Sequence, residues 1–360
     1  MFEKLNLKFK KEKFDKQNDV STQKTDEFCL PLVNAKDGNN GIMYYGRESD
    51  FESSELTIDI VNDGAVSTGN VYSQPQKTGV LYNAYLIRPF CEVTPNLLHF
   101  FACTIQKSIK LKFGYQNKAG WAKVAKEKIQ LPTKDSKIDF EFMESFIAEL
   151  EAQRIAELEA YLTVSGLDNY ELSSEELDAL QRLESRQWDT FNLEKLFGKA
   201  TRGKRLKSND RIDGPLPFVT AGEGNEGISA HIGNHVEVFA QNTTTIDMFG
   251  SAKYRNYEYG ADDHIAVVHT EHLPQDAAVF ITTAIHKSSH NGQFHYGKNF
   301  YAKDADALNI QLPTKDGKID YEFMEKFISA IRKLVIKDVV LYADQKIAAT
   351  KRVVASGGQS

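Results

Sequence analysis

The sequence contains a long internal repeat, and this repeat limits the possible folds more than any other feature. Residues 129–147 read IQLPTKDSKIDFEFMESFI and residues 310–328 read IQLPTKDGKIDYEFMEKFI, so 16 of 19 positions are identical without a gap. A weaker echo lies upstream, where LPLV and GNNGI within 30–42 match LPFV and GNEGI within 216–228. Solenoid repeats are roughly 20–50 residues long. Offsets of 181 and 186 residues therefore indicate a duplicated domain.

Length and composition fit a protein of two globular domains outside the membrane. A chain of 360 residues can bury two separate cores, and 41% hydrophobic with 26% charged residues is an ordinary globular composition. No run of eighteen apolar residues occurs, and the first fourteen residues lack the apolar centre of a secretion signal. Cys29, Cys91 and Cys103 form no C-x-x-C pair. We therefore expect a cytoplasmic protein without structural zinc.

The net charge of −6 conceals a segregation of charge along the chain. Residues 139–184 hold thirteen acidic and two basic residues, a local net charge of −11, which leaves +5 for the remainder. The two repeated regions are thus mildly basic and the segment between them is strongly acidic. We expect that segment to face solvent or a protein partner, because an acidic surface does not bind phosphates.

Apolar residues at steps of three and four predict a long helix after each repeat. Asp139 and Asp320 are placed to cap these helices. We expect the two apolar stripes to pack together as an antiparallel coiled coil, with Arg154 interrupting the first. The first stripe has Phe142, Met143, Phe146, Ile147, Leu150, Leu158 and Leu162, and the second has Met324, Ile328, Ile331, Val335, Val339 and Tyr342.

The remaining patterns predict shorter elements. Residues 173–176 form a capping box for an acidic helix that we expect to reach about Trp188. Alternating or β-branched runs predict strands at 56–61, 80–87, 235–239, 264–268 and 278–281, and short helices are expected at 97–106 and 277–286. The fold class is mixed α+β: two pseudo-symmetric α/β domains separated by two long helices. The expected boundaries are 1–138, a helical spacer at 139–187, 188–319, a spacer helix at 320–352 and a flexible tail at 353–360.

The order of the repeated words resembles the specificity subunit of type I and type IIB restriction-modification systems. Residues 191–197, GKRL at 203–206 and GPLPFVTA at 214–221 look like the opening of a target recognition domain, and YG at 296–297 followed by IQLP at 310–313 looks like its close. The first copy begins differently but rejoins the pattern at 30–46. The compact length is more similar to type IIB subunits, and type I stays open.

The resemblance implies a subunit without catalysis of its own. Its two domains would each recognise half of an interrupted, asymmetric DNA site, and its helices would dock methyltransferase and endonuclease subunits. S-adenosylmethionine and Mg²⁺ are then expected on the partner, with no cofactor on this chain. A helix of about 25 residues is roughly 37 Å long, about ten base pairs of duplex, which suits half-sites about one turn apart. The alternative is a structural adaptor whose helices and domains bind proteins.

Base and phosphate contacts need cations, amides and small polar groups. The leading candidates occupy equivalent places just before each closing word. They are Lys107, Lys110, Lys112, Tyr115, Asn117 and Lys118 in the first copy, and His286, Lys287, His290, Asn291 and Lys298 in the second. A solvated loop with incidental charge is the alternative for any one of them.

A second group follows a glycine in each copy, with an ordinary hairpin as the alternative. It consists of Tyr72 and Gln74 after Gly69, and Lys253 and Arg255 after Gly250. A basic run at the entrance of the second copy, Arg202, Lys204 and Arg205, fits phosphate contact or a solvated surface.

Two motifs are interpreted as incidental. GEGNEG at 222–227 satisfies the dinucleotide pattern G-x-G-x-x-G, but the first copy lacks the first glycine and no βαβ unit surrounds it. We expect a tight turn there. His286, His290 and His295 have metal-like spacing, but the equivalent positions are near Gln106, Lys110 and Tyr115, so no metal site is expected.

Overall fold

A computed structural model describes residues 1–357 of the chain. It divides into two compact units, Met1–Leu158 and Glu159–Ser360, and the division falls inside the predicted helical spacer. We refer to the units as the first and second domain. No helix among the described residues is both long enough and apolar enough to cross a bilayer.

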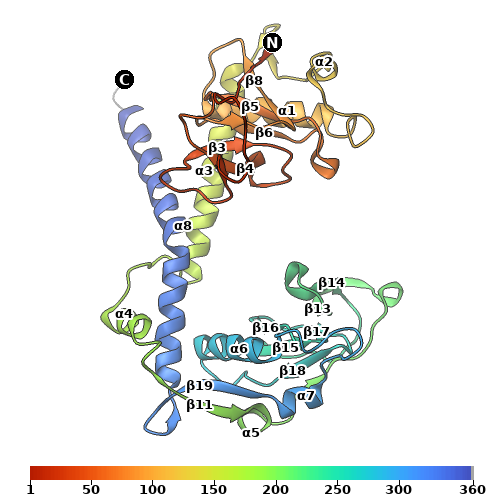
Figure 1. The fold of residues 1–360 in the computed structure, drawn as a ribbon, viewed down its shortest axis with the longest axis vertical. Helices are drawn as coiled ribbons and strands as arrows, with labels where there is room; N and C mark the ends of the chain where they lie inside the picture. The colour runs from red at the N-terminus through yellow and green to blue at the C-terminus, as the bar shows by residue number, and fades with distance from the viewer. Residues whose placement is uncertain (358–360) are drawn as a thin grey trace. The chain divides into compact units, whose positions relative to one another are not determined.

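The first domain contains two four-stranded sheets, a two-stranded sheet and one helix that covers a sheet (Figure 1). One sheet has the order β1-β8-β5-β6 and is covered by helix α1, and the other has the order β2-β4-β3-β7. The elements are β1 (Phe2–Lys4), β2 (Val20–Ser21), β3 (Leu30–Val33), β4 (Ile42–Gly46), β5 (Thr57–Val61), β6 (Val71–Gln74), β7 (Gly79–Val80), β8 (Ala84–Pro89), α1 (Pro95–Ile109), α2 (Trp121–Val124), β9 (Thr133–Lys134), β10 (Lys137–Ile138) and α3 (Phe140–Val164), with short 3-10 turns η1 (Asn39–Gly41) and η2 (Ala65–Ser67).

The second domain repeats this plan with an additional strand. Sheet β12-β18-β15-β16 is equivalent to β1-β8-β5-β6, sheet β14-β13-β17 replaces β2-β4-β3-β7, and strand β11 is added to β19-β20, the equivalent of β9-β10. The elements are α4 (Ser174–Gln181), β11 (Gln187–Asn192), α5 (Leu193–Phe197), β12 (Thr201–Arg202), η3 (Ser208–Asp210), β13 (Asp213–Val219), η4 (Gly224–Gly227), β14 (Ile228–Ile232), β15 (Thr243–Asp247), β16 (Ala252–Arg255), β17 (Gly260–Ala261), β18 (Ile265–Val268), α6 (Gln275–Ser289), α7 (Ala302–Ala307), β19 (Asn309–Lys315), β20 (Lys318–Ile319) and α8 (Tyr321–Gly357).

In both domains a helix covers one face of the antiparallel sheet. Ile58 and Ile60 of β5 are completely buried with Phe101 of α1, and Ile246 of β15 is buried with Ile281 and Ile285 of α6. Because side chains alternate along a strand, the intervening residues of β5 and β15 face the second sheet of each domain. That face is less apolar, since it holds Asp59 in the first domain and Thr245 in the second.

The predicted helix starts are confirmed by their capping bonds. Asp139 Oδ1 accepts a hydrogen bond from the backbone N–H of Phe142 at 2.9 Å, and Asp320 Oδ1 accepts one from Phe323 at 3.0 Å. The capping box at Ser173 is also present. Helix α4 ends at Gln181, and Trp188 lies in strand β11. The predicted end of this helix, near Trp188, was therefore wrong.

The long helices differ in detail from the predicted apolar stripes. Met143 and Met324 belong to the cores of their own domains. The first turns of α3 and α8 pack on the sheet-covering helices α1 and α6, respectively. Leu150 is 41% exposed and Val335 is 75% exposed, whereas Val340 and Ala343 are buried. The buried face of α8 is therefore rotated from the predicted one, and the antiparallel pairing of the two helices stays a prediction.

Three local predictions need correction. Residues 235–239 form no strand and contribute only an isolated bridge from Phe239 to Tyr259. Residues 278–281 lie inside α6, where Ala278, Phe280 and Ile281 are buried. Helix α8 continues to Gly357, five residues into the predicted tail, and residues 358–360 lie outside the described part of the chain.

Candidate nucleic-acid interface

Each domain brings together the two segments that the sequence singled out, and a third segment joins them. We call this arrangement the three-segment site. In the first domain it comprises residues 36–41, 65–74 and 107–118, and in the second domain residues 222–227, 248–255 and 286–298. In both, the end of the sheet-covering helix contacts the glycine turn before a strand, and the turn at η1 or η4 contacts that strand.

In the first domain, Lys110 and Tyr72 join the three segments. The Lys110 ammonium donates to the carbonyl oxygens of Val66 at 2.8 Å and Thr68 at 3.3 Å, and it also bonds the Asn70 side chain. The Tyr72 hydroxyl accepts from the Asn70 amide at 2.8 Å and from the Gly38 N–H at 3.0 Å. These side chains therefore position the loops that would meet a ligand.

The second domain builds the same junction from charged groups and imidazoles. Lys253 Nζ donates to Ser251 Oγ at 2.9 Å and pairs with Glu223 at 3.3 Å. The hydrogen bond from Ser251, followed by the charge of Lys253, lowers the pKa of Glu223. His286 accepts from the Ala252 N–H at 3.2 Å and its ring lies 4.8 Å from that of His290. Burial, followed by the proximity of His290, lowers the pKa of His286.

A glycine makes the helix-to-turn contact possible in both domains. Gly69 and Gly250 have φ of 78° and 83°, which L side chains rarely adopt. A Cβ on Gly250 would overlap the carbonyl oxygen of Ser289, and one on Gly69 would lie 3.5 Å from the Lys110 Cα. The Ser289 hydroxyl also donates to the Gly250 carbonyl at 2.6 Å. The glycine turn therefore fixes the end of the helix.

Gln74 and Arg255 are not surface contacts, which corrects two predicted site residues. Both lie on the strand face that points between the two sheets, and they are 0% and 1% exposed. Gln74 Nε2 donates to the Asn40 carbonyl at 2.7 Å. Arg255 donates to Thr245 Oγ1 and to the Tyr257 hydroxyl, both at 2.9 Å. Their polar groups form hydrogen bonds inside the domain, so these residues support the loops of the site without reaching the surface.

The other predicted loop residues lie on the surface, and several are already paired. Lys112 pairs with Glu127, Lys118 pairs with Asp63, and Lys298 lies 5.4 Å from the Phe294 ring centroid. Asn117 donates to the Lys112 carbonyl and Asn291 to the Ser288 carbonyl, at 2.8 and 3.4 Å. Exposed ion pairs of this kind are weak, so these cations can exchange partners for phosphate oxygens.

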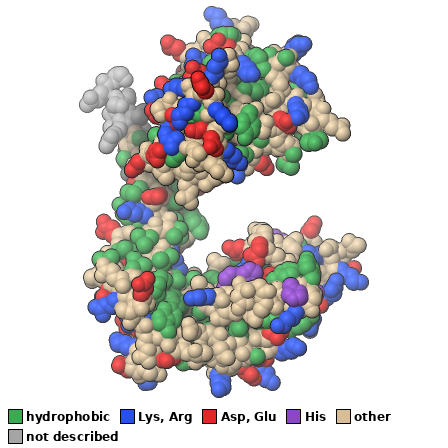
Figure 2. Space-filling model, in the orientation of Figure 1, with side chains coloured by type: hydrophobic (Ala, Val, Ile, Leu, Met, Phe, Trp, Pro, Cys, Tyr) green, Lys and Arg blue, Asp and Glu red, His purple; other side chains and the backbone are tan. Residues whose placement is uncertain are grey.

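Lys107 and Lys287 are exposed, and Lys287 is directed away from the His286 junction although both residues belong to the segment 286–298. It lines a hollow of about 500 Å³ with Trp188, Phe280 and Phe327, on a different side of α6 from His286. On the face that Figure 2 shows, Lys and Arg are interspersed with Asp and Glu over both domains. Tyr115 and Tyr296, 75% and 84% exposed, are the prominent aromatic side chains of the two helix-end loops.

The basic run at the entrance of the second domain lies beside an acidic cluster. Arg202 donates from Nε to the Asp263 carbonyl at 2.6 Å and pairs with its carboxylate at 3.3 Å. Lys204 and Arg205 are exposed and form no ion pair with the side chains of residues 1–349. They are therefore the members of the run that remain open to phosphate contact.

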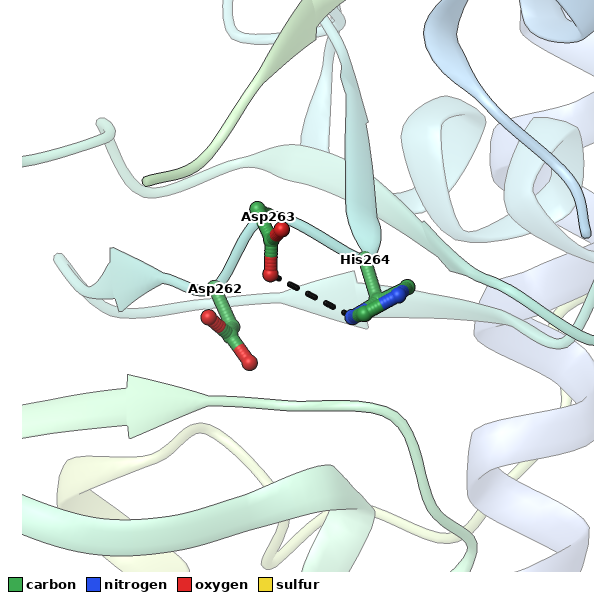
Figure 3. Close-up of side chains that lie close together, drawn as sticks. All are labelled: Asp262, Asp263 and His264. Carbon is green, nitrogen blue, oxygen red and sulfur yellow. Dashed lines mark ion pairs between the residues drawn. The ribbon is translucent and has the colours of Figure 1, made fainter. Parts of the chain in front are cut away.

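One group of residues in the described chain has the spacing of a metal site (Figure 3). It consists of Asp262, Asp263 and His264, whose possible ligand atoms all lie within 4.8 Å of each other. His264 Nδ1 lies 3.3 Å from Asp263 Oδ1, and Arg202 binds the other carboxylate oxygen. The Asp263 carboxylate is therefore already paired with the Arg202 guanidinium. Because Arg202 lies in β12 and Asp263 precedes β18, this ion pair helps to attach β12 to β18. His286, His290 and His295 do not form such a group.

Sequence reasoning missed one buried titratable residue beneath the first site. Asp59 is completely buried, and neither of its oxygens has a hydrogen-bond partner among the described residues. Burial raises its pKa well above the ordinary value. A Cβ on Gly41 would overlap its carboxyl, and the equivalent residue in the second domain is Thr245, which binds Arg255. The polar residues under the equivalent loops therefore differ between the two domains.

A duplicated α/β domain with a polar loop site at the same place in each copy defines a binding protein with two equivalent domains. The sequence model of the family described as the type I restriction modification DNA specificity domain matches residues 2–160 and 185–341. The chain belongs to this family and carries two copies of its domain. It is therefore a specificity subunit, and recognition rather than catalysis is its role.

Two relatives agree with this assignment. The specificity subunit S.BcgI of a type II restriction enzyme from Heyndrickxia coagulans is 24% identical over 330 residues, which cover 88% of this chain and 90% of that protein. The crystal structure of the type I restriction-modification S subunit from M. genitalium is 15% identical, with a TM-score of 0.52 over 99% of this chain and 94% of that one. The second likeness supports the fold alone.

Proposed function

We propose that this chain directs a restriction-modification complex to an asymmetric, interrupted DNA sequence, with each domain reading one half. The observation that supports this most is the repetition of one backbone arrangement with different side chains. Asn70, Tyr72 and Gln106 form the junction in the first domain, and Ser251, Lys253 and His286 stand at the equivalent positions in the second. Different donors and acceptors on equivalent loops select different bases.

Affinity in this proposal comes mainly from phosphate neutralisation. The exposed cations Lys107, Lys204 and Arg205 are suited to this role, since none of them is held in an ion pair with the side chains of residues 1–349. Each phosphate contact releases condensed counterions, so the observed affinity falls steeply as salt rises. The exposed Tyr115 and Tyr296 and the polar groups at the helix ends would then supply contacts to base edges.

The long helices are the proposed docking elements for the catalytic partners. Helix α3 has 25 residues and is roughly 37 Å long, about ten base pairs of duplex. We propose that methyltransferase and endonuclease activities, together with S-adenosylmethionine and Mg²⁺, reside on the partner, and that the complex acts in the cytoplasm. The type I and type IIB organisations differ in whether those activities share one polypeptide. Isolation of the native complex and identification of its chains distinguishes the two.

Selection of bound duplexes from a random library by the assembled complex tests the proposal. The expected result is a motif of two short, different elements separated by a fixed gap of unread bases. Sequencing of modified bases in cells that carry the intact system should return the same motif. A single contiguous motif, or a palindrome, would contradict the assignment of one half-site to each domain.

A further inference from the structure

The same six residues, Ile-Gln-Leu-Pro-Thr-Lys, adopt different structures in the two domains. At 310–315 they form most of β19, which pairs with β11 along six positions, and Ile310 and Leu312 are completely buried. At 129–134 only the last two residues form a strand, and Ile129 and Leu131 are half-buried. The sequence is unchanged, so the difference lies in what surrounds it.

In the second domain a segment covers this sequence, and no described residue of the first domain does so. β11 and α5 come directly before β12, and β12 pairs with β18 as β1 pairs with β8. Among residues 1–357, no strand pairs with residues 129–132 and no helix stands beside them as α5 stands beside β11 in the second domain. The backbone groups of Ile129 and Leu131 form no hydrogen bond to any other described residue. An unpaired strand edge of this kind is a template for another strand.

A hollow and two exposed aromatic side chains mark the same uncovered place. The hollow has a volume of about 220 Å³ and is lined by Phe2, Ile105, Val124 and Ile129 among others. The residues equivalent to Ile105 and Ile129 are Ile285 and Ile310, which in the second domain are buried with Leu193 and Phe197 of α5. The hollow therefore corresponds to the position that α5 fills.

The aromatic residues differ in the same sense. Phe142 and Phe146 are 48% and 46% exposed, whereas Phe323, the equivalent of Phe142, is 3% exposed. In the second domain the residues around β11 provide the cover: the Arg186 guanidinium lies 4.3 Å from the Phe323 ring centroid, and Trp188 stacks on Phe280 at 6.2 Å.

We propose that the first domain accepts an extended segment of a partner polypeptide at residues 129–133 and the adjoining hollow. The segment adds an antiparallel strand to this edge, covers Phe100 with an aromatic side chain, and continues into a short helix whose apolar side chains fill the hollow. Strand addition to an exposed edge is a common mode of peptide recognition. We call this surface the strand-acceptor site.

The second domain supplies the register of the added strand. Pro313 lies opposite Trp188 and has no N–H, so this pair is the non-hydrogen-bonded type. The alternate residues Ile310 and Leu312 therefore carry the ladder bonds. By equivalence, Ile129, Leu131 and Thr133 provide the backbone donors and acceptors in the strand-acceptor site, and Pro132 fits between them without losing a bond.

A partner polypeptide is the occupant that the contacts favour. A second copy of this chain would have to surrender β11, which is already paired along six residues and stacked through Trp188. The charge expected of the occupant can be compared with that of α4, the acidic helix that precedes β11 in the second domain. Lys326 and Lys333 bind Glu175 and Glu176 of α4, and their equivalents in the first domain are Ser145 and Ala152. With exposed Glu141 and Glu149 nearby, the flank of the occupant should be neutral or basic.

The first test titrates a fluorescent peptide of sequence QWDTFNLEKLF, residues 187–197 of this chain, into the purified full-length protein. We expect saturable binding at one site per chain. Leu131→Asp should weaken binding at least tenfold, whereas Gln130→Asp, on the opposite face of the same strand, should leave it unchanged. A peptide with alanine in place of Trp188 should bind at least fivefold more weakly. Absence of binding, or equal effects of the two variants, would overturn the strand-acceptor site.

The second test identifies the natural occupant in the assembled complex. Partner addition should slow amide hydrogen exchange at Ile129, Leu131 and Thr133 at least tenfold, and a photo-crosslinker at Gln130 should capture a segment of the partner. Unchanged exchange, or a crosslink to a second copy of this chain or to another part of the same chain, would overturn the partner assignment. Of the two tests, only this second one rests on the proposed function, because it needs the complex with the partner subunits. The peptide titration needs no DNA, so its failure leaves the proposed DNA recognition intact.

Discussion

Glu176 attaches helix α4 to helix α8, and its removal gives the best-defined stability prediction. Its Oε1 accepts from the Ser329 hydroxyl at 2.6 Å, and its Oε2 accepts from the Ser173 N–H at 2.7 Å and from Lys333 Nζ at 2.9 Å. Burial would raise the pKa of Glu176, but these hydrogen bonds outweigh it and lower the pKa to about 2. The carboxylate is therefore charged and fully engaged at neutral pH.

Glu176→Ala should destabilise the second domain by roughly 3 kcal/mol, because hydrogen bonds to a charged group contribute about 1.5–3 kcal/mol and do not add fully. For a domain of this size that corresponds to a fall in Tm of about 6–12 °C. Glu176→Gln should cost about half as much, since the amide oxygen can still accept from Ser173. Glu175 is the matched control: it is 69% exposed and pairs with Lys326 at 3.4 Å, so Glu175→Ala should change stability by less than about 1 kcal/mol.

The assay is urea unfolding followed by tryptophan fluorescence. The chain has two tryptophans, Trp121 in the first domain and Trp188 in the second, so a Trp121→Phe background reports the second domain alone. The pKa of Glu176 lies below its ordinary value of 4.5, so its stabilisation is present above that pH and is lost as pH falls toward 2. Wild type should thus lose stability more steeply than Glu176→Gln below pH 5. Equal effects of Glu176→Ala and Glu175→Ala would refute the reasoning.

Three further predictions concern other parts of the molecule. Gly250→Ala should destabilise the second domain by more than about 2 kcal/mol, because φ is positive and the added Cβ would overlap the Ser289 carbonyl. Gly292→Ala is the control and should cost only about 1 kcal/mol, because φ is 86° but no atom lies near the added Cβ. Thermal unfolding measures both. Asp59→Asn should stabilise the first domain at pH 7 by roughly 1–2 kcal/mol. Because burial raises the pKa of Asp59, the wild-type deficit should shrink as pH falls toward 4, and a pH-independent difference in urea unfolding would contradict this. Lys204→Ala and Arg205→Ala should each weaken DNA binding about equally for all sequences and reduce the salt slope by about one, as measured by fluorescence anisotropy.

The repeat predicted the duplicated domains, the helix starts at Asp139 and Asp320 and the equivalence of the two loop sites, because each of these depends on local sequence. Contacts between distant residues were not predictable in the same way. The pairing of β11 with β19 joins residues more than one hundred positions apart, and no local pattern at 187–192 indicates it. Residues 278–281 were assigned to a strand because a short apolar run fits a buried helix equally well.

The candidate site shows the same division. The sequence identified the correct segments, because their order is repeated, but it could not determine which side chains reach the surface. Gln74 and Arg255 sit on strands whose two faces are both covered, so alternation alone does not separate a DNA contact from a buried hydrogen bond. Asp59 was missed because a carboxylate in a β-branched strand carries no signal of its burial until the second sheet is placed.

The central claim is that each domain reads its own half of the DNA site. The most direct measurement compares the sequences selected by the assembled complex with those selected by two variants, Tyr115→Ala in the helix-end loop of the first domain and Asn291→Ala in that of the second. The account predicts that each substitution relaxes bases in one half-site only, and that the two substitutions affect opposite halves. Relaxation of both halves by either variant, or of the same half by both, would contradict it.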